Sequence, residues 1–216
     1  MQATRSGTEM AGAPARRART FTEDARRAQI VTAATDTIAE LGFRQASFAQ
    51  IARRAGLSST GLISYHFAGK AELMQEVASH VIGLIAADMT ERMRQVTGPA
   101  QALETYVRAS VGFIASHRRE MKALLEILLN GALDYGPDAE LVTLTPVAEI
   151  LRAGQAAGEF RDFDPRVLAT VIQRSIDAVP LLLETYPDID LSAYANELVT
   201  TVRLATTRQP AGDDAR

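Results

Sequence analysis

The sequence predicts an all-α protein of about nine helices, with a small three-helix domain at the N-terminus and a larger helical body after it. Apolar residues recur at helical spacing along most of the chain, beginning with Ile30, Ala34 and Ile38. Capping residues, glycines and prolines separate these runs at the places where helices are expected to end. No alternating polar and apolar pattern of any length occurs, so we expect no sheet.

The composition limits the class of protein. Of the 216 residues, 47% are apolar and 23% are charged, which is enough for a sizeable core and untypical of a disordered chain. The absence of cysteine excludes disulfides, zinc ribbons and thiol catalysis. There is no stretch of about 18 consecutive apolar residues and no apolar signal segment near the N-terminus. We therefore expect a cytoplasmic protein without a membrane partner.

The charge is distributed unevenly along the chain. Residues 1–70 contain ten Arg or Lys and five Asp or Glu, whereas residues 71–216 contain thirteen bases and twenty-one acids, so a net charge of −3 divides into +5 and −8. A basic end attracts phosphate, and an acidic body disfavours indiscriminate binding to nucleic acid. Residues 1–20 end in a basic cluster and are expected to form an arm that either stays solvated or becomes ordered along DNA.

Three helices are expected in the N-terminal domain, residues 21–70. The first covers residues 22–41 and ends at a glycine. The second follows the capping residue Ser47 and ends at Gly56. The third begins at Ser58 or Ser59 and is expected to turn three apolar side chains inward, those of Leu62, Ile63 and Phe67.

Six helices are expected in the body, residues 71–206, before a disordered tail at residues 207–216. Pro146 should break or kink the fourth of them and Pro180 should kink the fifth. In chain order the six cover residues 71–96, 101–116, 117–133, 141–157, 165–185 and 191–206.

The segment FAQIARRAGLSSTGLISYHFAGK, residues 48–70, has the pattern of a helix-turn-helix. Two short helices flank a glycine turn, and Ala52, Ala55 and Gly56 are small enough to let them cross closely. Such a unit places its second helix in the major groove of DNA. Together with the local positive charge, this pattern predicts that residues 21–70 form a DNA-binding domain.

The residues around this motif resemble the tetracycline-repressor (TetR) family of bacterial regulators. A helix ending in LGF precedes IARRAGLS and then ISYHFAGKAEL, and the resemblance covers residues 25–75. It implies an all-helical homodimer that binds a palindromic operator and releases it on binding a small ligand. One departure is that the chain has one residue more between Gly56 and Tyr65 than the commonest family spacing. The residue that faces the bases is therefore left open.

Short polar side chains early in a recognition helix can reach base edges, so Ser59, Thr60 and Ser64 are predicted base contacts. Ordinary capping of the helix by Ser58 or Ser59 is an equally good explanation for each serine alone. The resemblance implies that Tyr65 and His66 contact the DNA backbone. The full predicted DNA-binding set is Arg44, Ser47, Ser58, Ser59, Thr60, Gly61, Ser64, Tyr65, His66 and Lys70.

The body offers weaker candidates. Methionines, aromatic residues and a few polar side chains at helical spacing could line a ligand pocket, although such residues more often form plain core. The candidate pocket residues are Met89, Met93, Tyr106, Phe113, Met121, Leu124, Leu128, Gln173 and Asp177. The last two helices are apolar on more than one side, so by analogy they are expected to pack against a second copy through Ile172, Ile176, Val179, Leu183, Leu198 and Val202.

The leading functional prediction is a ligand-responsive, sequence-specific transcriptional repressor that a small, largely apolar molecule releases from a palindromic operator. The expected partners are double-stranded operator DNA, which would hold the protein at the nucleoid, a second copy of the chain and a small-molecule effector. The alternative is a DNA-binding regulator that a protein partner controls. An enzyme is disfavoured, because the chain has only three histidines, no phosphate-binding loop and no acid–base constellation. No cofactor or metal is expected, and His66 has no suitably spaced partner ligand.

Overall fold

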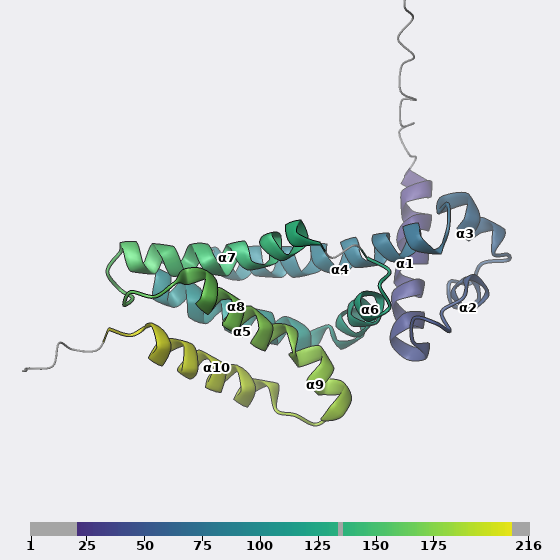
Figure 1. The fold of residues 1–216 in the computed structure, drawn as a ribbon. Helices are drawn as coiled ribbons and strands as arrows, with labels where there is room; N and C mark the ends of the chain where they lie inside the picture. Colours follow the sequence, from purple (N-terminus) through teal and green to yellow (C-terminus); the bar gives the residue numbers. More distant parts are fainter. Residues whose placement is uncertain (1–20, 134–135, 209–216) are drawn as a thin grey trace, which may run out of the picture.

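The computed structural model describes residues 21–133 and 136–208, and within them the chain is entirely helical, with no strand (Figure 1). The predicted arm, residues 1–20, and residues 209–216 of the predicted tail lie outside the described residues. The all-α prediction is confirmed. In chain order the helices are α1 (Phe21–Leu41), α2 (Phe48–Arg54), α3 (Gly61–His66), α4 (Lys70–Met93), α5 (Pro99–Ser116), α6 (Arg118–Leu129), α7 (Pro137–Ala156), α8 (Pro165–Asp177), α9 (Val179–Thr185) and α10 (Leu191–Thr206).

The nine predicted helices are present, and the predicted kinked helix of residues 165–185 is divided into α8 and α9. Pro180 is the second residue of α9 and has no N–H to donate to α8, so one helix ends at Asp177 and the next begins two residues later. Pro146, by contrast, lies inside α7, which is continuous from Pro137 to Ala156. Of the two prolines expected to bend a helix, Pro180 therefore separates two helices, whereas Pro146 causes no break.

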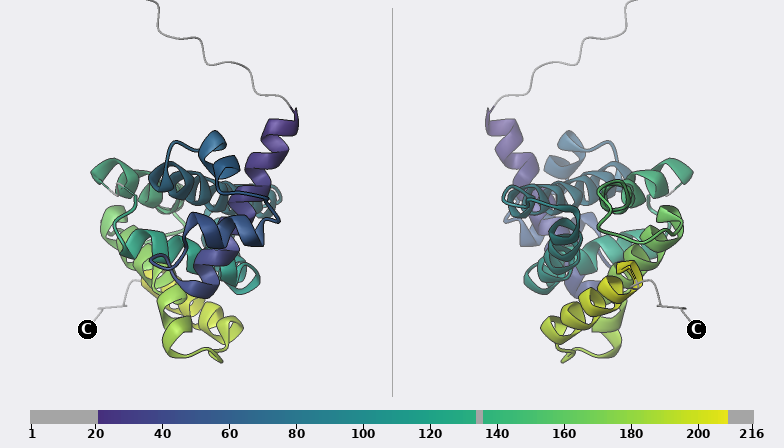
Figure 2. Two further views of the ribbon diagram at one scale, coloured as in Figure 1. Left: turned by 90° about the vertical axis from the view of Figure 1, so that its right-hand side faces the viewer. Right: turned by 90° about the vertical axis from the view of Figure 1, so that its left-hand side faces the viewer.

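Helices α1, α2 and α3 form a head at one end of the molecule, and α4 leads from this head along the body (Figure 1). Helix α5 lies in the middle of the body, where it packs against α4, α7 and α10. Helix α7 packs against α8, and α6 packs against both α1 and α4. Figure 2 shows α9 and α10 together along one edge of the body.

The hydrophobic core of the head extends into the body. Side chains of α1, α2 and α3 pack in one buried cluster with the first turns of α4, including Leu73 and Val77. Ala123 and Ile127 of α6 are fully buried in the same cluster. Packing in the head therefore crosses the predicted boundary at residue 70, and α6 supplies part of the surface on which the head rests.

A second cluster of buried apolar side chains fills the body around α5, and it includes residues that were predicted to contact a second copy. Four of the six predicted residues are buried within the chain's own core: Ile172, Ile176, Val179 and Val202. Leu183 and Leu198 are half-buried beside this cluster. The exposed apolar side chains of α8, α9 and α10 are Val167, Val171, Leu181 and Leu204.

Gly154 of α7 packs directly on a buried aromatic ring. A Cβ at Gly154 would overlap the ring of Phe160, which is almost fully buried. Gly83 of α4 is also helical but has nothing within 4 Å of the position of a Cβ. The same substitution should therefore have opposite effects at these two positions.

We expect Gly154→Ala to lower the free energy of unfolding by about 1–3 kcal/mol through overpacking. Gly83→Ala should raise it by about 0.5–1 kcal/mol, because alanine loses less backbone entropy than glycine in a helix. Urea unfolding at one protein concentration measures both. A Gly154→Ala protein as stable as the Gly83→Ala protein would show that the Phe160 ring does not lie on Gly154.

Candidate nucleic-acid interface

The turn between α2 and α3 forms as its residues predict. The Ser47 side chain caps α2 by accepting a hydrogen bond from the Gln50 N–H at 3.3 Å. Gly56 has φ 65°, a left-handed conformation that glycine adopts without steric cost. After this turn, the Leu57 N–H donates to the Ala52 carbonyl at 2.9 Å. The chain thereby reverses direction and starts α3 across α2.

The recognition helix α3 begins later than predicted. Its first residue is Gly61, and Thr60 precedes it as the N-cap with helical backbone angles and no capping side chain. Ser58 and Ser59 therefore lie in the turn before α3, and neither caps the helix. The extra residue noted in the sequence is accommodated in this turn, which leaves Ser58, Ser59 and Thr60 exposed.

Helix α3 has one buried and one exposed face. Ile63 and Phe67 are buried in the core of the head, as predicted. Leu62 is 38% exposed, so its predicted place in the core is wrong, and Tyr65, one turn further along, is 72% exposed. We call the exposed residues of this segment the reading surface: Ser58, Ser59, Thr60, Gly61, Leu62, Ser64 and Tyr65. Arg44 and Ser47, also predicted to contact DNA, are exposed near the start of α2.

Arg27 of α1 fixes the end of the recognition helix, a role that sequence reasoning missed. Its buried guanidinium donates to the His66 carbonyl and to Glu76 Oε2, the latter at 2.8 Å, and lies 4.1 Å from the centre of the Phe67 ring. One side chain thus joins α1, α3 and α4. Arg27 is one helical turn before the buried Ile30, and that spacing could have identified it as a buried arginine.

His66 helps to position the reading surface through its backbone carbonyl, which accepts from Arg27, and through a contact of its ring with Tyr65. Its ring meets the Tyr65 ring edge-on, with centroids 5.0 Å apart. This contact orients the exposed Tyr65 beside the rest of the reading surface. Within residues 21–133 and 136–208, no group of three or more His, Cys, Asp or Glu side chains is placed to hold a metal ion.

Lys70, the first residue of α4, turns toward the loop between α1 and α2. Its Nζ donates to the Phe43 carbonyl at 2.8 Å and lies 4.3 Å from the centre of the Phe43 ring. Partial burial lowers the pKa of Lys70. An ammonium has three N–H donors, so this contact leaves donors for a DNA phosphate.

Glu126 of α6 binds the backbone N–H of Phe43, the residue whose carbonyl accepts from Lys70. Its Oε2 accepts a hydrogen bond from the Phe43 N–H at 2.8 Å. Gly42, immediately before, has φ 81°, and this conformation lets the chain present that N–H to α6. We call Glu126, Phe43 and Lys70 the Phe43 clamp, because side chains of α6 and α4 hold the N–H and the carbonyl of Phe43.

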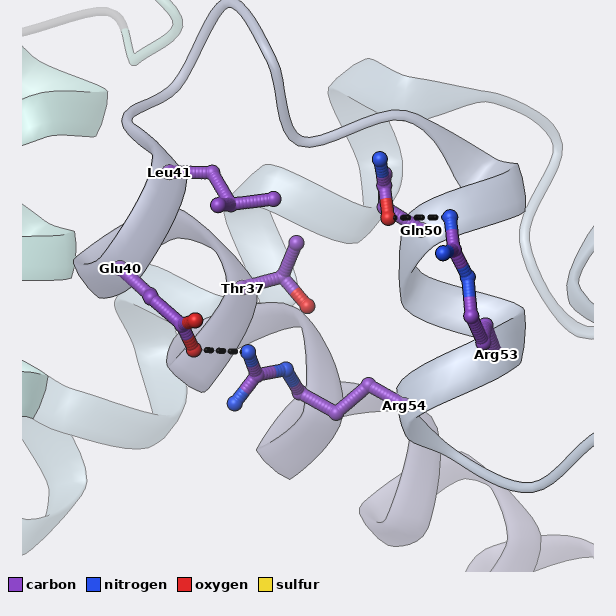
Figure 3. Close-up of a pocket in the computed structure, with 6 residues that line it drawn as sticks. All are labelled: Thr37, Glu40, Leu41, Gln50, Arg53 and Arg54. Atoms are coloured by element: carbon purple, nitrogen blue, oxygen red, sulfur yellow. Dashed lines mark hydrogen bonds and ion pairs between the residues drawn. The ribbon is translucent and has the colours of Figure 1, made fainter.

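A polar hollow of about 350 Å³ lies between α1 and α2 in the head (Figure 3). Its arginines are engaged within the head: Arg54 pairs with Glu40 of α1, and Arg53 Nη2 donates to Gln50 Oε1 at 2.6 Å. The Arg54–Glu40 pair joins α2 to α1, whereas the Arg53–Gln50 bond lies within α2. The remaining residues around the hollow are Thr37 and Leu41.

Three of the nine predicted pocket residues form a hydrogen-bonded chain that runs from the buried Tyr106 and Gln173 to the exposed Asp177. The Tyr106 hydroxyl donates to Gln173 Oε1 at 2.6 Å, and Gln173 Nε2 donates to Asp177 Oδ1 at 2.8 Å. Burial raises the pKa of Tyr106 to about 12 and also raises the pKa of Asp177. The first of these hydrogen bonds joins α5 to α8, and the second lies within α8.

Of the other predicted pocket residues, Met89 and Met121 pack against the same cluster as Tyr106, and Met121 also packs against the cluster that contains Leu124. Phe113 stacks on His117, Leu124 packs in a small cluster with Val81, and Leu128 is exposed. Met89, Met93 and Met121 are half-buried on α4 and α6. A groove of about 350 Å³ lies elsewhere, between α5 and α10, and none of the nine lines it: its apolar walls are Leu103, Val107, Phe160, Val199 and Val202.

Among the described helices, none is both long enough and apolar enough to span a membrane.

Comparison with known proteins agrees with this geometry. Residues 30–77 match the family described as "Bacterial regulatory proteins, tetR family". The chain is 34% identical over 87 residues to the HTH-type transcriptional regulator BetI of Escherichia coli O139:H28 (strain E24377A / ETEC), covering 40% of this chain and 43% of that protein. It is 27% identical over 156 residues to the A-factor receptor protein of Streptomyces griseus, covering 72% and 54%. The chain thus spans about half the length of these curated relatives.

The fold is similar to that of a transcriptional regulator from Saccharomonospora viridis solved in complex with choline. The TM-score is 0.76 at 22% identity, over 86% of this chain and all of that one. The matched segment spans most of α1, all of α2 and α3 and the first turns of α4, so it includes the reading surface and, of the Phe43 clamp, Phe43 and Lys70. The family match over residues 30–77, the relatives and the fold together support a transcriptional regulator of the tetR family.

Proposed function

We propose that this protein is a transcriptional repressor that binds a palindromic operator as a homodimer and releases it when a small molecule binds the body. The observation that carries the proposal is the reading surface on α3, which is exposed while the rest of the helix is fixed to α1 and α4 by Arg27. A rigidly held, exposed helix of this motif is the element that enters a major groove. Arg44, Ser47, Tyr65, His66 and Lys70 would contact the DNA backbone around it.

The shared core supports control of the head by the body. Helix α6 contributes Ala123 and Ile127 to the core of the head and binds Phe43 through Glu126. A ligand that shifts α6 would therefore shift the head, and a dimer whose heads move apart loses one of its two half-sites. Two relatives support a small-molecule effector, since one is named a receptor for A-factor and another was solved with choline. In this chain, Tyr106, Gln173 and Asp177 are candidate polar groups for such a ligand.

A second copy is proposed to pack on the exposed apolar side chains of α8, α9 and α10, which replace the buried residues of the original prediction. Val167 and Val171 lie one turn apart on α8, and Leu181 and Leu204 are exposed on α9 and α10. A two-fold axis through such a surface would match the symmetry of a palindromic site.

Binding to the DNA that flanks the protein's own gene tests the proposal. We expect a gel shift that survives scrambled competitor at physiological salt, and a footprint with two-fold symmetry. Loss of the shift on adding one compound from a metabolite set would identify an effector. Specific binding that responds to no compound would favour the alternative, a regulator that a protein partner controls. Equal competition by scrambled DNA would contradict the proposal.

Lys70→Met should weaken binding to every DNA sequence to the same degree, because the proposed contact is with phosphate. Methionine keeps an apolar stem on the Phe43 ring but removes the charge. The plot of log binding constant against log salt should flatten by about 0.9 per subunit. Lys122→Met, on α6 where Lys122 pairs with Glu184, is the matched control and should leave the slope unchanged. An unchanged slope in Lys70→Met would mean that α4 does not meet the backbone.

Glu126→Ala should loosen the head, because the Phe43 N–H loses a charged acceptor. We expect the free energy of unfolding to fall by about 1.5–3 kcal/mol and operator affinity to fall with it. Glutamine, which retains an acceptor oxygen, should restore most of both. Glu120→Ala changes the same residue type on the same helix and is the control. If urea unfolding and gel shifts give the same values for Glu126→Ala and Glu120→Ala, the Phe43 clamp does not hold the head.

A further inference from the structure

The reading surface contains no side chain suited to the usual bidentate contacts with bases. Between Ser58 and His66 the chain has no Arg, Lys, Asn, Gln, Asp or Glu. Arginine or lysine commonly reads guanine, and asparagine or glutamine reads adenine, through pairs of hydrogen bonds in the major groove. The surface instead offers short hydroxyls, a glycine, the aromatic ring and hydroxyl of Tyr65, and one large aliphatic side chain. Its base specificity must therefore rest on different contacts.

Leu62 is that aliphatic side chain, and the structure exposes it where DNA would lie. It is the second residue of α3, in the first turn, where recognition helices contact base edges. Leu62 and Tyr65 are three residues apart, so they lie on the same side of the helix, opposite the buried Ile63 and Phe67. The exposed part of Leu62, 38% of the residue, would lose its contact with water on docking.

We propose that Leu62 determines specificity by packing against the C5-methyl group of a thymine in each operator half-site; this inference rests on the proposed function above. The thymine methyl is the one apolar group that a base pair presents in the major groove. A leucine pressed on a G·C pair would instead cover polar groups of guanine or cytosine without offering them a hydrogen bond, which is unfavourable. Thymine is therefore selected both by contact and by exclusion.

Deoxyuridine substitution tests the inference, because it removes only the methyl group and leaves base pairing intact. Each thymine of one half-site is replaced in turn, in an operator obtained by selection from random DNA with the full-length protein. We expect one position at which wild-type affinity falls about fourfold, the effect of one buried methyl group. Leu62→Ala should bind the thymine operator more weakly and show no further loss at that position.

Leu141→Ala is the matched control, since it truncates an exposed leucine on α7, away from the head, and should reproduce the wild-type profile. The helical content of Leu62→Ala should match wild type, because Leu62 does not belong to the buried cluster of the head, and thermal unfolding establishes a temperature at which both proteins are folded for the binding comparison. Selected half-sites that lack thymine, or a methyl effect of equal size in wild type and Leu62→Ala, would overturn the assignment of Leu62 while leaving operator binding intact. Failure of wild type to distinguish operator from scrambled DNA would overturn the proposed function and this inference with it.

Discussion

The structure depends on one shared core, in which helix α6 of the body completes the packing of the DNA-reading head. Ala123 and Ile127 are buried among side chains of α1, α2, α3 and α4, so the head has no closed core of its own. The Phe43 clamp adds directed bonds to this apolar contact, since Glu126 holds the N–H of Phe43 and Lys70 holds its carbonyl. Interiors packed in this way respond to displacement by shifting as units, so motion of α6 and motion of the head are coupled.

The recognition helix owes its position to the same arrangement. Helix α3 has six residues, too few to be stable alone, so its conformation is imposed by its neighbours. Ile63 and Phe67 attach one face to the shared core, and Arg27 binds the final carbonyl of the helix while also reaching Glu76 of α4. The face left outside is short and mostly polar, and it carries no Arg, Lys, Asn, Gln, Asp or Glu. Readout of DNA by this protein therefore depends on placing a small surface accurately in the groove.

Local signals in the sequence predicted the helices, the glycine turn after α2 and the Ser47 cap, because each depends on residues close together in the chain. The Phe43 clamp joins residues 83 positions apart, and no local pattern indicates such a contact. Periodicity also failed for Ile172, since an apolar face looks the same whether it packs on its own body or on a second copy. Leu62 was misplaced for a related reason: in a helix of six residues, one step around the axis separates core from solvent.

Hydrogen exchange of α6 in the presence and absence of operator DNA tests the coupling most directly. If the body controls the head, linkage requires that DNA bound to the head also changes the body, and no effector is needed to observe this. The account predicts slower exchange on DNA binding both in residues 21–70 and in α6, residues 118–129, and a smaller change in α6 when Glu126 is replaced by alanine. Protection confined to residues 21–70, with α6 exchanging at the same rate in free and bound protein, would contradict it.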